Sequence, residues 1–172
     1  MTQPVEPTVV VNDASCLIDL RKGQLLHALM MLPYRFLIPL PVRYSELLDF
    51  SEQDWAALDG GGLKTFDLPA DRVTEAFGVK AIHPKLSAND CFCLVVSRCH
   101  DSSVLLTGDA LLRRVAGDEG RRVHGVLWVI DELRVHTCCD DGPLIAALEI
   151  WRDDQSVFLP PREIENRLRA MR

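Results

Sequence analysis

The sequence predicts an α/β fold, a three-layer α/β/α sandwich around a mostly parallel sheet, with further helices at the C-terminal end. Two patterns predict it. Short runs of β-branched and aliphatic residues alternate with longer segments whose apolar residues recur at helical spacing. After residue 125 only the helical spacing remains. At ~150 residues per domain, the 172 residues predict an N-terminal arm (1–7), one α/β domain (8–124) and a helical extension packed on it (125–172).

The first strand–helix units are predicted over residues 8–47. Val-Val-Val at 9–11 is a buried strand, and the apolar period becomes helical from Asp13, with Gly23 able to divide that stretch into two helices. Phe-Leu-Ile at 36–38 predicts the second strand. The prolines that follow it favour a helix start, and we expect this helix to reach residue 47 and to contain Glu46.

The middle of the chain predicts shorter elements. Ser51 begins a capping-box sequence for a short helix, which the three glycines at 60–62 end. A weak strand at 65–68 is followed by a helix over 69–77. Residues 82–85 are expected to form a loop, because a proline disfavours helical backbone in the residue before it.

A clearer unit covers residues 87–124. Ser87 and Asp90 have capping-box spacing at the start of a helix, a buried strand follows at 104–106, and Asp109 leads into another helix before a short strand at 122–124. The last helices are expected at about residues 126–135, 143–152 and 162–171. In the helix after Ser87, the residues expected to face inward are Phe92, Val95, Val96 and Cys99.

The composition excludes several classes of protein. It is 48% hydrophobic and 26% charged, which is unlike a disordered or fibrous chain, and the net charge of −6 lacks the positive excess of a non-specific nucleic-acid binder. No apolar run reaches the length of a membrane helix, and the first residues show no secretory signal pattern. We therefore expect a cytoplasmic protein with no membrane partner and with its six cysteines reduced.

Acidic residues follow the predicted strands. Asp13 comes after the first strand, Glu46 lies beyond the second, and Asp90 and Asp109 flank the strand at 104–106. In an open parallel sheet, ligands bind beyond the carboxyl ends of the strands, so these four side chains are expected to converge. Each alone suits a helix cap or a solvated surface. Together they would repel unless a cation neutralised them, and oxygen ligands favour Mg²⁺ or Mn²⁺.

These motifs, in this order, resemble those of the PIN-domain nucleases, which include the VapC-type toxins and longer bacterial PIN proteins. The likeness rests on Val-Val-Val-Asn-Asp13-Ala-Ser15, on Glu46 in Pro-Val-x-x-x-Glu-Leu, on Leu-Ser-x-x-Asp90 and on Leu-Leu-Thr107-Gly-Asp109. It covers about residues 8 to 124. The resemblance implies a divalent-metal-dependent endoribonuclease that hydrolyses RNA phosphodiester bonds, with Mg²⁺ or Mn²⁺ as cofactor.

The resemblance also assigns roles to residues. Asp13, Glu46, Asp90 and Asp109 match the catalytic, metal-binding acids, which would lower the pKa of a bound water and offset charge on the transition state. The supporting hydroxyls are Ser15 and Thr107, which could equally be local hydrogen-bonding groups. Cations near this edge of the sheet are expected to meet the RNA phosphates. They are Arg21, Lys22, Lys85, Arg113 and Arg114.

Partners follow from the resemblance alone. RNA is the expected substrate, a homodimer is the expected assembly, and a toxin of a type II toxin–antitoxin pair would also bind a small antitoxin protein. Long helices after residue 125, with Trp128 and Trp151, are where we would look for a subunit interface.

Other functions are weighed against this one. The cysteine spacing suits zinc poorly, and no histidine at a strand end has an evident partner for metal-free RNA cleavage. An Mg²⁺-dependent phosphatase on a doubly wound sheet usually has Asp-x-Asp after the first strand, whereas Ser15 stands two residues after Asp13 here. A PIN-like binding module without activity is the remaining alternative, although the presence of all four acids disfavours it.

Overall fold

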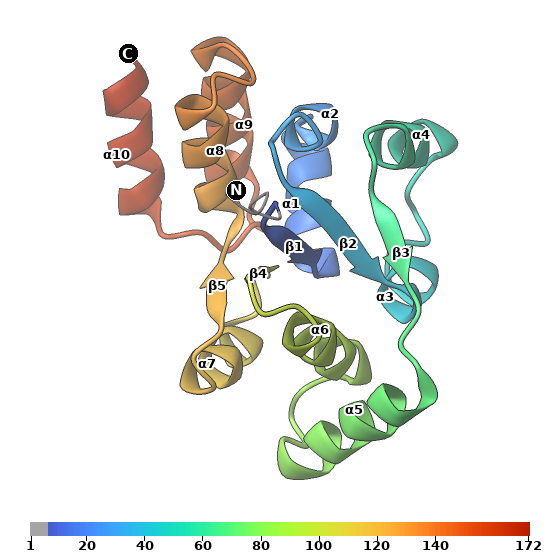
Figure 1. The fold of residues 1–172 in the computed structure, drawn as a ribbon. Helices are drawn as coiled ribbons and strands as arrows, with labels where there is room; N and C mark the ends of the chain where they lie inside the picture. The colour runs from blue at the N-terminus through green and yellow to red at the C-terminus, as the bar shows by residue number, and fades with distance from the viewer. Residues whose placement is uncertain (1–6) are drawn as a thin grey trace, which may run out of the picture.

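The computed structural model describes residues 7–172, and its centre is a five-stranded sheet (Figure 1). The strand order is β3-β2-β1-β4-β5, and every neighbouring pair is parallel. The three-layer prediction is confirmed, with a sheet that is wholly parallel. The predicted arm, residues 1–7, lies outside the described residues except for its last residue. The strands are β1 (Val9–Asn12), β2 (Arg35–Pro39), β3 (Lys64–Phe66), β4 (Ser103–Leu106) and β5 (Arg122–His124).

The first strand is the middle of the sheet. After β1 the chain builds β2 and β3 on one side, and then returns to place β4 and β5 on the other. All residues of β1 and β4 are buried, which explains why both strands read as continuous apolar runs. The boundary between β1 and β4 is where the strand order reverses, so the crevice beyond their carboxyl ends is the expected ligand-binding position.

Helices cover both faces of the sheet. In Figure 1, α5, α6 and α7 lie on one side of it, and α1, α2, α8, α9 and α10 on the other. Helix α6 packs on β1, β2 and β4, while α9 packs on α1 and α10 packs on α9. The helices are α1 (Ala14–Lys22), α2 (Leu26–Leu29), α3 (Leu40–Ser45), α4 (Glu52–Gly60), α5 (Ala70–Ile82), α6 (Ala88–Arg98), α7 (Ala110–Asp118), α8 (Val126–Val135), α9 (Asp141–Asp153) and α10 (Pro161–Met171).

Three local predictions are wrong. Helix α3 ends at Ser45, so Glu46 is its C-cap and not a residue inside it. Helix α5 continues to Ile82, five residues beyond the predicted end, because Ala76 and Val79 are buried and the Lys80 ammonium binds the carbonyls of Pro84 and Leu86. Helix α6 buries a wider face than predicted, while Phe92 and Cys99 are only partly buried. Its buried residues are Cys91, Cys93, Leu94, Val95, Val96 and Ser97.

The C-terminal helices are joined to α1 by close packing. The buried Trp151 of α9 donates its indole N–H to the carbonyl of Asp19, at 2.7 Å. A Cβ added to Gly23, the C-cap of α1, would lie 3.0 Å from the side chains of both Ala147 and Trp151. Glycine therefore allows α1 and α9 to approach. Among residues 7–172, no helix is long and apolar enough to cross a membrane.

Candidate functional site

Asp13 is the centre of the candidate site and lies at the carboxyl end of β1. The residue is 4% exposed, and its backbone N–H donates to the carbonyl of Leu106 at the end of β4. One carboxylate oxygen, Oδ1, accepts from the Ala14 N–H at 2.8 Å, which caps α1. The other, Oδ2, accepts from the hydroxyls of Thr107 at 2.7 Å and Ser15 at 2.9 Å. Three donors thus hold a buried carboxylate at the switch point of the sheet.

The two hydroxyls also bind the loop that follows β4. Ser15 Oγ accepts from the Gly108 N–H at 2.9 Å, and Thr107 Oγ1 accepts from the Asp109 N–H at 3.1 Å. Because each hydroxyl hydrogen is directed to Asp13, each oxygen remains free to accept these backbone donors. Ser15 and Thr107 therefore connect the ends of β1 and β4, which is the local hydrogen-bonding alternative named above.

Electrostatic effects link Asp13 to Asp90 and to Glu46. Burial raises the pKa of Asp13 above its ordinary value and the charge of Asp90 raises it further, against the lowering effect of the bonds from Thr107 and Ser15. Partial burial of the carboxyl group also raises the pKa of Glu46. The charges of Asp13 and Asp90 add to that increase, and the Asn89 side chain opposes it. The charge of Asp90 thus raises the pKa of Asp13 and of Glu46, and the charge of Asp13 raises that of Glu46, so the three acids are near enough to interact.

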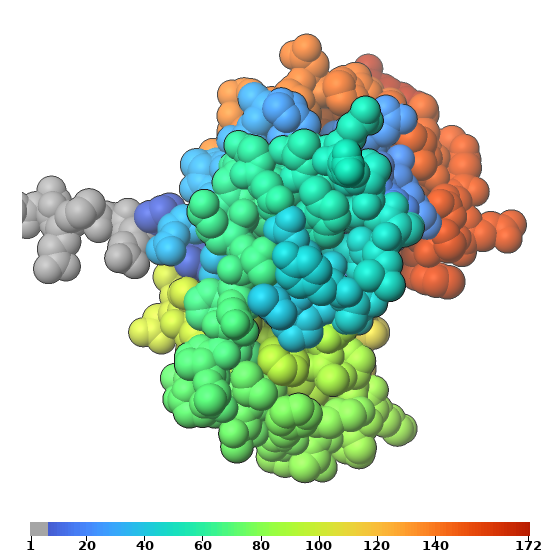
Figure 2. Space-filling model, turned by 90° about the vertical axis from the view of Figure 1, so that its right-hand side faces the viewer, coloured from blue at the N-terminus to red at the C-terminus, as the bar shows by residue number. Residues whose placement is uncertain are grey.

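These two acids reach the site from neighbouring elements. Glu46 ends α3, Asp90 lies in the first turn of α6, and α3 packs against α6. Figure 2 shows the face of the molecule on which the end of α3 and the start of α6 lie. Asp90 also completes the predicted capping box, since its Oδ2 accepts from the Ser87 N–H at 2.7 Å. The side-chain amide of Asn89 donates to Ser45 at 2.8 Å and so joins the two helices beside Glu46.

Asp109 is linked to Asp13 through its backbone N–H and the Thr107 hydroxyl. Its N–H binds Thr107, as described, and its carboxylate Oδ1 accepts from the Leu112 N–H at 2.7 Å, which caps α7. Its side chain is exposed at the same edge of the sheet. The structure therefore links Asp13, Glu46 and Asp90 by charge, and Asp13 and Asp109 by a two-step hydrogen-bond chain.

The donor atoms of the four acids suit a hard divalent cation. They supply only oxygen donors, and their mutual repulsion is what a cation would relieve. Within residues 7–172, however, no three carboxylate, imidazole or thiolate groups are close enough to surround one ion. The thiol of Cys93, 4.0 Å from Asp13 Oδ1, is fully buried, and burial holds its pKa well above the usual value. A neutral thiol there acts as a small apolar neighbour of the carboxylate.

The five predicted cations differ in their surroundings. Arg21 binds Asp49 at 2.7 Å and lies over the ring of Phe50, and Lys22 binds Asp154 at 3.1 Å. Among the described residues, Lys85, Arg113 and Arg114 form no ion pair. Arg21 and Lys22 are therefore paired with carboxylates, whereas the other three, unpaired among residues 7–172, are available to bind a phosphate.

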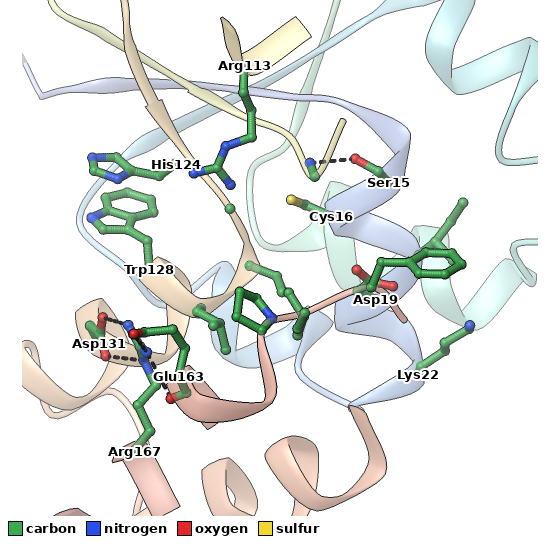
Figure 3. Close-up of a pocket in the computed structure, with 18 of the residues that line it drawn as sticks. Ser15, Cys16, Asp19, Lys22, Arg113, His124, Trp128, Asp131, Glu163 and Arg167 are labelled. Carbon is green, nitrogen blue, oxygen red and sulfur yellow. Dashed lines mark hydrogen bonds and ion pairs between the residues drawn. The ribbon is translucent and has the colours of Figure 1, made fainter. Parts of the chain in front are cut away.

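A pocket of about 670 Å³ lies beside the acids, and no sequence pattern predicts it (Figure 3). We call it the lateral pocket. It is formed by α1, the loop after β4, the β5–α8 junction, and the segment that leads into α10. Only its Ser15 and Gly108 belong to the cluster around Asp13. It was missed because its walls come from segments far apart in the sequence. The lining residues used below are Ser15, Gly108, Arg113, His124, Trp128 and Phe158.

Comparison with protein families identifies the family of this chain. A family model described as a PIN domain matches residues 9–171, which is nearly the whole chain. The match runs across residue 124, so the division into a domain and an extension stays a prediction. No curated protein and no solved structure matches the chain.

Proposed function

The chain belongs to the PIN-domain family, whose members are generally nucleases, and from this premise we propose that it is a divalent-metal-dependent endoribonuclease acting on RNA phosphodiester bonds. One observation supports this most: a buried carboxylate, Asp13, is fixed at the switch point, and the charge of Asp90 acts on both Asp13 and Glu46. Carboxylates gathered at this position in a parallel sheet suit a cation and a phosphate better than a purely structural role.

Each residue then has a definite task. Asp13, Glu46, Asp90 and Asp109 would hold Mg²⁺ or Mn²⁺ partly through water, since no three of them are close enough to surround the ion directly. When bound, the ion supplies Lewis-acid activation of water and charge neutralisation at the phosphate. Ser15 and Thr107 keep the Asp13 carboxylate in one orientation through Oδ2. The Ala14 N–H at the start of α1 keeps its other oxygen in place. Such preorganisation avoids the cost of ordering these groups during the reaction.

The phosphatase alternative expects Asp-x-Asp after the first strand, and so a second aspartate two residues after Asp13. Ser15 occupies that position, and its oxygen both donates to Asp13 and accepts from Gly108. This hydroxyl is therefore used in holding two strand ends together, which favours water as the nucleophile. The antitoxin partner and the homodimer stay predictions, as does a toxin role.

The test is cleavage of a panel of single-stranded RNAs by the purified protein in Mg²⁺, in Mn²⁺ and in EDTA. We expect cleavage only with metal, and a loss of at least about 100-fold in the Asp90→Asn variant. Asparagine retains an oxygen that can accept from the Ser87 N–H, so the helix cap survives.

The matched control is Asp71→Asn, which changes an exposed acid in the first turn of α5. It should cleave at the wild-type rate. RNA left intact in every metal by a folded wild-type protein would overturn the proposal and favour a binding module. Cleavage in EDTA, or an active Asp90→Asn protein, would contradict the assignment of the acids.

A further inference from the structure

The lateral pocket opens directly beside the proposed site. Ser15, which donates to Asp13, and Gly108, which donates to Ser15, both line it. A phosphate held at Asp13 would therefore have the pocket next to it. The pocket volume of about 670 Å³ lies within the range of sites that enclose small organic ligands.

A guanidinium group that has no partner among residues 7–172 points into this pocket. Arg113 extends from α7 across the β5–α8 junction, as Figure 3 shows. A Cβ on Gly125 would lie 2.5 Å from its Nη1, so glycine at this position leaves room for the group. The other cationic side chains of the lining are neutralised, since Arg167 binds Asp131 and Glu163, and Lys22 binds Asp154. Among residues 7–172, Arg113 is thus the one arginine or lysine of the pocket lining that remains available to bind an anion.

Aromatic side chains form the walls. His124 and Trp128 are stacked with ring centroids 4.8 Å apart and planes 8° apart, and Trp128 stacks on Tyr34 behind it at 5.8 Å. The pair is therefore already ordered, so a ligand would not have to immobilise it. Phe158 also lines the pocket and is 91% exposed, the largest exposure among the big apolar side chains described. A phenylalanine left so exposed is available to a planar ligand.

Resting on the proposed function, we propose that the lateral pocket binds a nucleotide of single-stranded RNA adjacent to the bond that is cleaved. Arg113 would contact a phosphate of that nucleotide, and its base would lie between Phe158 and the His124–Trp128 wall. A single charge-assisted contact combined with aromatic surface is the chemistry by which proteins hold unpaired bases. A base-paired strand could not place its base there, so the pocket selects unpaired RNA.

The experiment measures binding without cleavage. A fluorescein-labelled single-stranded RNA is titrated with protein in EDTA over a series of salt concentrations, and the anisotropy gives Kd. We expect Phe158→Ala to weaken binding about tenfold. We expect Arg113→Gln to weaken it similarly and to make the slope of log K against log salt shallower by about 0.7, since one phosphate contact is lost. Phe158→Ala should leave that slope unchanged.

Two controls match these variants. Arg35→Gln removes an exposed arginine at the opposite, N-terminal edge of the sheet, and Phe77→Ala removes an exposed phenylalanine of α5. Both should bind RNA like the wild type. All four changes are at exposed side chains, so the variants should keep the wild-type melting temperature.

The outcomes separate the two proposals. If the wild type cleaves and binds RNA while Arg113→Gln and Phe158→Ala have its Kd, the pocket is not a nucleotide site and the nuclease proposal stands. That result is also the one expected of a pocket that serves a protein partner. If Asp90→Asn and the wild type are both inactive and neither binds RNA, the proposed function itself fails.

Discussion

Asp19, a carboxylate on α1, lies on the wall of the lateral pocket and is partly buried there. Burial raises its pKa to about 6. Lys22 opposes that increase and Asp154 adds to it. The unfolded chain ionises this group near its ordinary pKa of 3.8, so the folded state has the higher affinity for the proton. The charged form of Asp19 therefore destabilises the fold, and this cost grows as the pH rises from 4 to about 6.

Replacing Asp19 by asparagine should remove that cost. After allowing for solvent screening, we expect Asp19→Asn to raise the free energy of unfolding by about 1 kcal/mol near neutral pH. Below about pH 3, where the wild-type group is largely protonated in both states, the two proteins should be equally stable. Urea unfolding at both pH values measures this. A gain that is the same at the two pH values would show that ionisation of Asp19 is not its cause.

Single residues differ in how well the sequence predicts them. Asp13 is predictable because it directly follows a buried strand, and the ends of parallel strands meet at one edge. Ser15 and Thr107 are identified by the resemblance to PIN-domain nucleases. Asp19 and Phe158 carry no such signal. Asp19 is distinguished by its burial and Phe158 by its exposure. Both depend on segments that are distant in the chain, and a single sequence does not specify how those segments pack.

At the level of elements, close packing of α1 and α9 depends on Gly23. An alanine there would place its Cβ 3.0 Å from Ala147 and Trp151, so one of the helices must shift. We expect Gly23→Ala to lower the free energy of unfolding by about 1–3 kcal/mol, as overpacking does. Gly78→Ala is the matched control. Gly78 lies within α5 with open space around it, so alanine should add about 0.5–1 kcal/mol.

Urea titrations of both variants measure these changes. A stable Gly23→Ala protein would mean that α9 moves away from α1 at little cost, and the C-terminal helices would then be loosely attached. The Gly78→Ala result tests whether the assay detects a small gain.

Elements were predicted well where local signals and tertiary packing agree. Both capping boxes form as expected, at Ser51 and Ser87, and the buried strands match the apolar runs. Predictions failed where packing decides. Helix α5 continues because Val79 is buried against its neighbours, and α3 stops before Glu46 although no local breaker marks that point.

For the whole molecule, a bound ion should add stability, because it binds the folded chain and not the unfolded one. At an Mn²⁺ concentration of about 100 times Kd, the gain is about 2.7 kcal/mol. For a chain of this length that corresponds to a rise in Tm of roughly 5–10 °C. Thermal melts in EDTA and in Mn²⁺ measure it for the wild type and for Asp90→Asn.

The variant should show a much smaller rise, while Asp71→Asn should match the wild type. Equal rises in all three proteins would indicate non-specific ion binding, and Asp90 would then not be a ligand. Because this measurement needs no RNA, it tests the metal site independently of the substrate.

The bond from Thr107 to Asp13 joins residues 94 positions apart, and the pairing of β1 with β4 spans a similar separation. Such distant contacts form late in folding, since a long loop must close first. During synthesis on the ribosome, β1 cannot pair with β4 until most of the chain has been made. The candidate site is therefore incomplete during most of synthesis. A nascent chain shorter than 107 residues should leave RNA intact, including the message that encodes it.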